Sequence, residues 1–226
     1  MPELTGTGGD GFAGGITSRQ RAHFSISHLL TAAFFSRKVG EIERANAGAE
    51  LGPFWDEMFS YAVGCVLTSF AGLEAYANEV FIDYADYYPE YQAPVMQDLW
   101  KTYERKRAPD KLKFALLLKG ITPDTGTSTW ENIRCLEALR DALTHFKAEW
   151  SDEKAKHAAL SKLLVNKAVP GTFLTGYSAL FPQLWVSHGT AMWAVRSVVS
   201  IIREFEGLLP PPNSKMEFFA RQLDDL

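Results

Sequence analysis

Cysteine is scarce in this chain, and that scarcity argues against two kinds of architecture. Only Cys65 and Cys135 occur among 226 residues, and neither has metal-ligating neighbours at a recognised spacing. Both fall within apolar helical patterns, where a free cysteine is typically a small buried hydrophobe. A disulfide framework and a cysteine-based metal centre are therefore not expected, and we predict neither a metal nor a cofactor.

An excess of positive charge is also absent. The net charge is −4 and the isoelectric point is about 5.8, which argues against a broad basic surface for general nucleic-acid binding, since such binding works by neutralising phosphates. A small local phosphate site stays open. Basic residues cluster locally, but such a run is more often a solvated helix face than a binding patch; its members are Lys101, Arg105, Lys106, Arg107, Lys111 and Lys113.

Strand and membrane patterns are missing as well. Alternating β-branched runs bounded by turn residues do not occur, so no strand is predicted. The uncharged run 168–195 is interrupted by proline and glycine and predicts a loop, while 58–73 is short for a bilayer and predicts a core helix. Residues 1–15 lack the basic start and apolar stretch of a signal peptide. We therefore expect a cytoplasmic protein without membrane association.

Apolar residues at steps of three and four dominate the rest of the chain and predict helices. Thr17 with Gln20 resembles a capping box that opens the first helix. The expected helices cover 17–45, 53–87, 95–105, 109–118, 128–146, 151–165 and 187–208. We predict an all-α fold, an up-and-down helical bundle with additional helices. The expected organisation is a flexible lead (1–16), one helical domain (17–209) and a tail (210–226) that begins with prolines and either docks a partner or frays.

The helix that ends Leu-Arg-Asp-Ala-Leu-Thr-His carries the most informative chemistry. Arg140 lies beside an apolar stripe, at the edge of the core, and its planar cation suits bidentate phosphate contact. Asp141 and His145 are four residues apart and share a face, so the carboxylate can orient the imidazole. An imidazole that transfers protons and a cation that stabilises phosphoryl charge are parts of a metal-independent RNA-cleaving site. Arg140 and His145 themselves, five apart, point in different directions.

The Arg-to-His spacing alone is a weak signal, because the chain holds eleven arginines and five histidines. A rival pair, Arg21 and His28, shares one helix face. It lacks the adjoining carboxylate and lies in the more polar first helix. We therefore interpret Arg21 and His28 as surface and core-edge polarity.

The combination of Arg140, Asp141 and His145 resembles the hallmark of the HEPN superfamily (higher eukaryotes and prokaryotes nucleotide-binding domain). That hallmark is an Arg followed by a polar residue and, four to six residues after the Arg, a His. The segment 69–78 also resembles the family's early long helix, which often carries a Glu and an Asn one turn apart, and Glu74 and Asn78 match. The resemblance covers about residues 55–208.

This resemblance implies a helical bundle that forms a homodimer, with two copies of the motif facing one cleft. Arg140 and His145 would then be catalytic, with Asp141, Glu74 and Asn78 in support. Many members are metal-independent endoribonucleases in toxin, defence or RNA-processing systems, which implies RNA as substrate and allows a cognate antitoxin or other protein partner. Other members have lost catalysis, so a non-catalytic module that binds a protein or nucleotide stays the alternative. Asp141 replaces the more frequent Asn, which favours a role in orienting His145.

Each of these residues also has a simpler structural interpretation. Arg140 with Asp141 fits a surface ion pair near a helix end, where His145 would interact with the helix dipole. Glu74 and Asn78 are typical of a satisfied polar contact between helices. Two other histidines are expected to be structural: His157 on a solvated helix face and His188 at a helix start.

Overall fold

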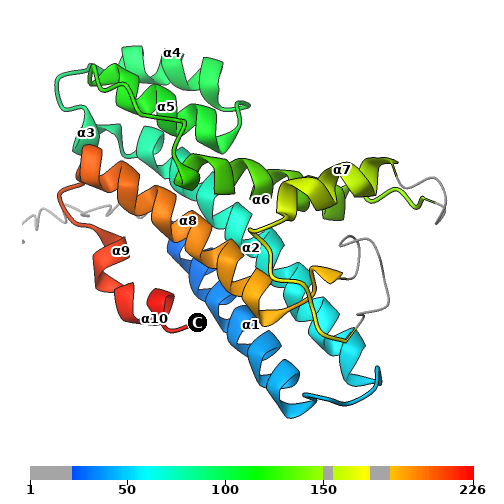
Figure 1. Cartoon of the computed structure of the whole chain (residues 1–226). Helices are drawn as coiled ribbons and strands as arrows, with labels where there is room; N and C mark the ends of the chain where they lie inside the picture. Colours follow the sequence, from blue (N-terminus) through cyan, green and yellow to red (C-terminus); the bar gives the residue numbers. More distant parts are fainter. Residues whose placement is uncertain (1–21, 150–154, 174–183) are drawn as a thin grey trace, which may run out of the picture.

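The computed structural model describes residues 22–149, 155–173 and 184–226, and the regular structure within these ranges is helical, with no strand. The predicted all-α bundle with additional helices is confirmed. Its centre is formed by α1 (Ser25–Ala45), α2 (Phe54–Ile82) and α8 (His188–Leu208), which pack side by side (Figure 1). These three helices contribute most of the fully buried apolar side chains.

Hydrogen bonds at the two ends of the bundle fix the directions of these helices. Tyr76 near the end of α2 donates to Glu206 near the end of α8 at 3.1 Å, and Glu43 near the end of α1 accepts from the His188 amide at the start of α8 at 2.6 Å. Therefore α2 and α8 run in the same direction, and α1 runs opposite to both. Gly72 permits the close approach of α1, because a Cβ there would lie 2.9 Å from the Leu29 side chain.

The smaller helices extend this centre (Figure 1). Beyond α2 come α3 (Tyr84–Tyr87), α4 (Ala93–Tyr103) and α5 (Ala108–Leu118). Then α6 (Ser128–Thr144) packs on α2 and α8, and α7 (Ala155–Leu164) packs on α6. The chain ends with α9 (Lys215–Phe218) and α10 (Ala220–Asp224).

The predicted single helix 53–87 was wrong at one position, because α2 ends at Ile82 and α3 begins at Tyr84. Asp83 between them has φ −92° and ψ 30°, outside the helical region, and its carboxylate lies 2.6 Å from His23 Nε2. Tyr88, which follows α3, donates to the Ala115 carbonyl of α5 at 2.8 Å. Both contacts are tertiary, so apolar periodicity could not reveal the break.

The tail docks on the bundle instead of fraying. Met216 and Leu223 are buried, and Arg203 of α8 makes two hydrogen bonds of 2.9 Å to the Asp224 carboxylate. Arg37 of α1 also donates to the Asp225 carbonyl at 2.8 Å. Residues 215–224 therefore cover part of α1 and α8.

The first helix begins later than predicted, at Ser25 and not at residue 17, because residues 22–24 are not helical; the remaining boundaries differ by up to four residues. The predicted capping box at Thr17 and Gln20, the rival Arg21, the lead 1–16 and Ser151 lie outside the described residues. By length and composition, α2 could cross a membrane, but core helices pass the same test, and α2 packs against α1, α6 and α8. Both cysteines are free and buried, as predicted.

Candidate functional site

Arg140 lies at the contact of α6 with α2 and is held from several sides. Its Nη2 donates to Glu74 Oε1 at 2.7 Å, and its Nη1 lies 3.0 Å from Asp141 Oδ1. The guanidinium carbon stands 4.4 Å above the centre of the Phe70 ring, and the side chain is 23% exposed. The predicted position at the edge of the core is therefore correct, and Arg140 has a fixed orientation.

Asn78, one turn after Glu74 on α2, has a different cationic partner. Lys111 of α5 donates to Asn78 Oδ1 at 2.6 Å and to the Glu104 carbonyl at 2.7 Å, and its ammonium lies 5.3 Å from the centre of the Trp100 ring. Burial lowers the pKa of Lys111, and the nearby carboxylates of Glu74 and Glu104 oppose that shift. The structure thus confirms the interpretation of Glu74 and Asn78 as satisfied polar contacts between helices.

Glu137 extends this polar cluster along α6. It is 7% exposed, and its Oε2 lies 3.5 Å from Arg107 Nη1. Burial raises its pKa, and the cations of Arg107 and Arg140 partly counteract that effect. We call the set of Glu74, Asn78, Lys111, Glu137 and Arg140 the polar network. Glu74, Asn78 and Arg140 were expected from the sequence, whereas Lys111 was expected only as part of a solvated basic run and Glu137 was not expected.

His145 is separated from this network. It is the C-cap of α6, beyond the last helical residue Thr144, with φ −113° and ψ 38°. Its backbone amide donates to the Asp141 carbonyl at 2.9 Å, but its imidazole is exposed and makes no hydrogen bond to another residue that the structure describes. The expected hydrogen bond between the imidazole and the Asp141 carboxylate is not formed, and that carboxylate pairs with Arg140 instead. The helix ends one residue too early to keep the imidazole and the carboxylate on one face.

His145 instead lines a small hollow of about 120 Å³ between the end of α6 and the start of α7. Lys147, Lys156 and His157 share this hollow. The expectation of a solvated His157 was wrong: its side chain is buried against the Phe146 ring, with centroids 5.7 Å apart, and lies 3.7 Å from Glu149. The signal that could have found these residues was weak, since positive and titratable groups follow His145 without helical spacing.

A second hollow, of about 300 Å³, lies near the C-terminal ends of α2 and α8, away from the motif, and carries acidic residues. The carboxylates of Glu79 and Glu206 are already engaged. Glu79 accepts from the amides of Phe24 and Ser25 at 2.8 and 3.0 Å, and Glu206 accepts from Tyr76 and Ser214. We interpret it as a structural junction, because its negative charge would repel phosphate.

In the described part of the chain, no group of three or more His, Cys, Asp or Glu side chains is placed to hold a metal ion. His188 is the first residue of α8, as expected for a helix start, and its ring packs closely on Gly40. His28 lies in α1, whereas the motif lies at the end of α6.

Comparisons with family models, with curated proteins and with solved structures found no match to this chain. A guanidinium fixed by Glu74 and an exposed imidazole at the end of the same helix can serve phosphate binding and proton transfer. Within one chain they face different surroundings, Arg140 towards α2 and His145 towards α7.

Proposed function

We propose that this protein is a metal-independent endoribonuclease of the HEPN type, with Arg140 and His145 as its catalytic residues. The observation that supports the proposal is the fixed orientation of Arg140 on α6, together with an accessible His145 that follows the last residue of the same helix. Glu74 holds one edge of the guanidinium and Phe70 supports its face. A phosphate would displace Asp141, whose carboxylate is 47% exposed and belongs to a pair of small energetic value.

The reaction needs no oxidant or cofactor. The ribose 2′-hydroxyl attacks the adjacent phosphorus, the 5′-oxygen of the next nucleotide leaves, and a cyclic phosphate forms on the upstream product. His145 takes or supplies a proton in this step, and Arg140 stabilises the charge that develops on the phosphoryl oxygens. Because these side chains diverge within one chain, we propose that two copies supply them to a shared cleft.

The alternative is a non-catalytic helical module that binds a protein or nucleotide partner. One observation favours it: Arg140 is already neutralised by two carboxylates, and its Nε is buried without a hydrogen-bond partner among the described residues. In this case Arg140 fastens α6 to α2. The C-terminal or cleft surfaces would then carry the interaction.

A cleavage assay in EDTA separates the two functions. Purified protein is incubated with total RNA, and the products are tested for cyclic phosphate ends. We expect the wild type to cleave RNA and His145→Ala to lose at least about hundredfold in activity. His28→Ala, which tests the rival pair, should keep the wild-type activity. An inactive wild type, or equal cleavage by His145→Ala, would sink the proposal in favour of the binding module.

Dimerisation is tested with the same variants. Mixing Arg140→Ala with His145→Ala should restore part of the activity if the residues act across a shared cleft, because mixed dimers contain one intact pair. Analytical ultracentrifugation gives the oligomeric state of each variant. No restoration from two folded, exchanging dimeric variants would refute a site built from two chains.

A further inference from the structure

Positive charge is concentrated in one short segment of an otherwise acidic chain. Residues 101–113 contain six basic and two acidic side chains, a net charge of +4, whereas the whole chain has −4. The segment spans the end of α4, the connection 104–107 and the start of α5. We call Arg105, Lys106 and Arg107 the basic turn. The segment's charge is opposite to that of the molecule as a whole, so it creates a local field that attracts anions.

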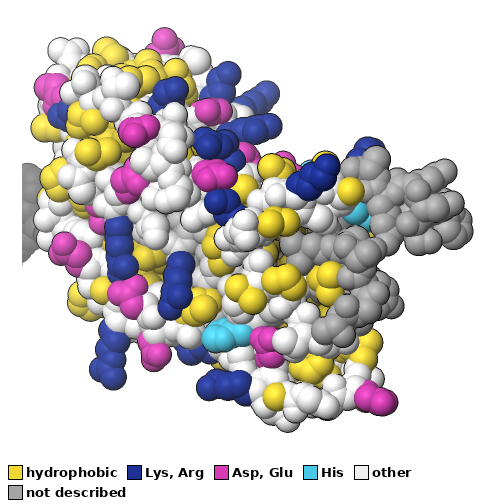
Figure 2. Space-filling view, viewed as in Figure 1, with side chains coloured by type: hydrophobic (Ala, Val, Ile, Leu, Met, Phe, Trp, Pro, Cys, Tyr) yellow, Lys and Arg dark blue, Asp and Glu magenta, His cyan; other side chains and the backbone are white. Residues whose placement is uncertain are grey.

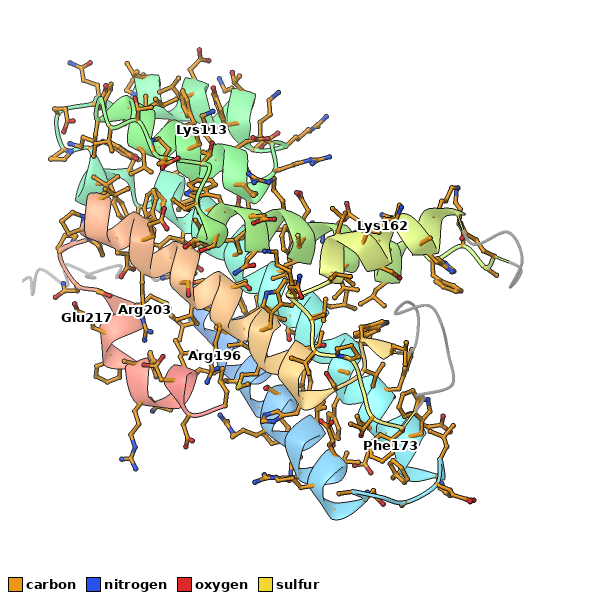
Figure 3. The ribbon with its side chains drawn as sticks, viewed as in Figure 1. Lys113, Lys162, Phe173, Arg196, Arg203 and Glu217 are labelled. Carbon is orange, nitrogen blue, oxygen red and sulfur yellow. The ribbon has the colours of Figure 1, made fainter. Side chains whose placement is uncertain are left out.

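The side chains of the basic turn extend into solvent. Arg105 is 94% exposed and Arg107 is 70% exposed, and Lys106 is exposed too. Figure 2 shows Lys and Arg side chains gathered at one end of α4 and α5, on the side of the molecule where α6 and α7 lie. Figure 3 shows Lys113 on α5 in the upper part of the molecule, Lys162 on α7 at the right, and Arg196 on α8 below them.

The backbone that carries these cations is fixed. Lys111 donates to the Glu104 carbonyl at 2.7 Å, and the Lys106 amide donates to the Tyr103 carbonyl at 2.9 Å. The Tyr103 ring stacks on Phe114 with centroids 3.6 Å apart. A fixed turn loses little backbone entropy when its side chains bind a ligand. Because Tyr103 stacks on a neighbouring aromatic ring, contacts to phosphate are favoured over stacking on bases.

The basic turn is joined to the proposed catalytic helix. Arg107 lies 3.5 Å from Glu137, and Glu137 precedes Arg140 by three residues, so both project from neighbouring turns of α6. On the α2 side, Asn78 holds Lys111 and Glu74 holds Arg140. The polar network therefore places the turn and Arg140 along one surface.

We propose that the basic turn binds the phosphodiester backbone of single-stranded RNA and guides the strand to Arg140. The proposal rests on the proposed function for its substrate class. Arg105 forms an ion pair with the exposed carboxylate of Glu104 at 3.7 Å. A surface pair of this kind is readily exchanged for phosphate. Recognition through phosphates is independent of base sequence, so cleavage specificity would come from the residues around His145.

The test measures binding separately from cleavage. Fluorescence anisotropy with a labelled single-stranded oligouridylate is recorded in the His145→Ala background, in EDTA, between about 50 and 200 mM salt. The test variant adds Arg105→Gln and Lys106→Gln and leaves Arg107, which pairs with buried Glu137, in place. The matched control adds Arg196→Gln and Arg221→Gln, two exposed cations of α8 and α10, and changes the net charge equally.

We expect the test variant to bind roughly tenfold or more weakly near 0.1 M salt, with a salt slope smaller by about 1.4, because each phosphate contact to single strands contributes about 0.7. The control should keep most of its affinity and slope. Equal losses in test and control variants, or no binding by His145→Ala itself, overturn the proposal. If binding depends on the turn but the wild type does not cleave, only the proposed function fails.

Discussion

Polar groups are buried in two different ways in this molecule. Where α1, α2 and α8 meet, the buried polar side chains are hydroxyls, among them Ser36, Ser69 and Thr190. We call the region where α2 meets α5 and α6 the shoulder, and it buries Lys111 and Glu137. Among the described residues, no other Lys, Arg, Asp or Glu is buried. Buried charge is a weak source of stability. The difference indicates that the centre stabilises the fold while the shoulder is organised around its charges.

Phe70 belongs to both regions, so its replacement should have the largest effect on the stability of the protein. The ring is 1% exposed within α2 and also supports the Arg140 guanidinium. We expect Phe70→Ala to lower the free energy of unfolding by about 3–5 kcal/mol, through lost apolar contact and a cavity. Urea denaturation followed by circular dichroism measures the loss.

Phe70→Leu is the matched control. It retains an apolar side chain but loses the ring under Arg140, so its cost should be smaller, with roughly 0.5–2 kcal/mol of it from the lost cation–π contact. A Phe70→Ala variant within about 1 kcal/mol of the wild type would contradict the assignment of Phe70 to the core.

Lys111 tests whether the shoulder depends on its buried cation. Lys111→Met keeps the aliphatic length but leaves Asn78 Oδ1 and the Glu104 carbonyl without their donor. We expect a loss of about 1–3 kcal/mol in the free energy of unfolding. Lys113→Met, an exposed position on the same helix, should change it by less than about 0.5 kcal/mol.

A double-mutant cycle with Asn78→Ala isolates the Lys111 contact. Because the two side chains are hydrogen-bonded, their effects should not add, and the interaction energy should be about 0.5–3 kcal/mol. Additive effects, or a Lys111→Met protein as stable as the wild type, would show that the buried cation does not hold the shoulder together.

Replacing Glu74 should change the catalytic activity much more than the stability. Its pair with Arg140 is partly exposed, so Glu74→Gln should change the free energy of unfolding by less than about 1 kcal/mol. If Arg140 must be oriented for catalysis, kcat should fall by about hundredfold with little change in KM. Glu131→Gln is the control, because it removes a similar pair with Lys167 at 3.1 Å on the same helix. Equal falls in both variants would exclude an orienting role for Glu74.

Much of the fold could be predicted from the sequence because the centre obeys helical periodicity. The stripes of α2 and α8 appear in the residue order, and the predicted start at residue 53 lies one residue before the observed start of α2 at Phe54. The same reasoning located Glu74 and Asn78 on α2 and Arg140 on α6. Their neighbours in sequence determine which face each occupies.

The partners of these residues could not be predicted. Lys111 was part of a basic run expected to be solvated, and only the packing of α5 on α2 buries it. The end of α6 at Thr144 decides that His145 leaves the helix face of Asp141, and helix ends are poorly specified by periodicity. Contacts between segments distant in sequence therefore determine the site, although Glu74, Asn78 and Arg140 could be identified in advance.

Glu137 gives the subtlest test of the shoulder, through the pH dependence of stability. Burial raises its pKa above the ordinary 4.5 in the folded protein. Between 4.5 and that raised value the folded state binds more protons than the unfolded state, so the wild type loses stability as pH rises. Glu137→Gln cannot titrate, so its stability relative to the wild type should increase across this window. Urea midpoints at a series of pH values measure the difference. If wild-type stability instead rises relative to Glu137→Gln with pH, the ion pair with Arg107 outweighs the cost of burial, and Glu137 stabilises the shoulder as a carboxylate.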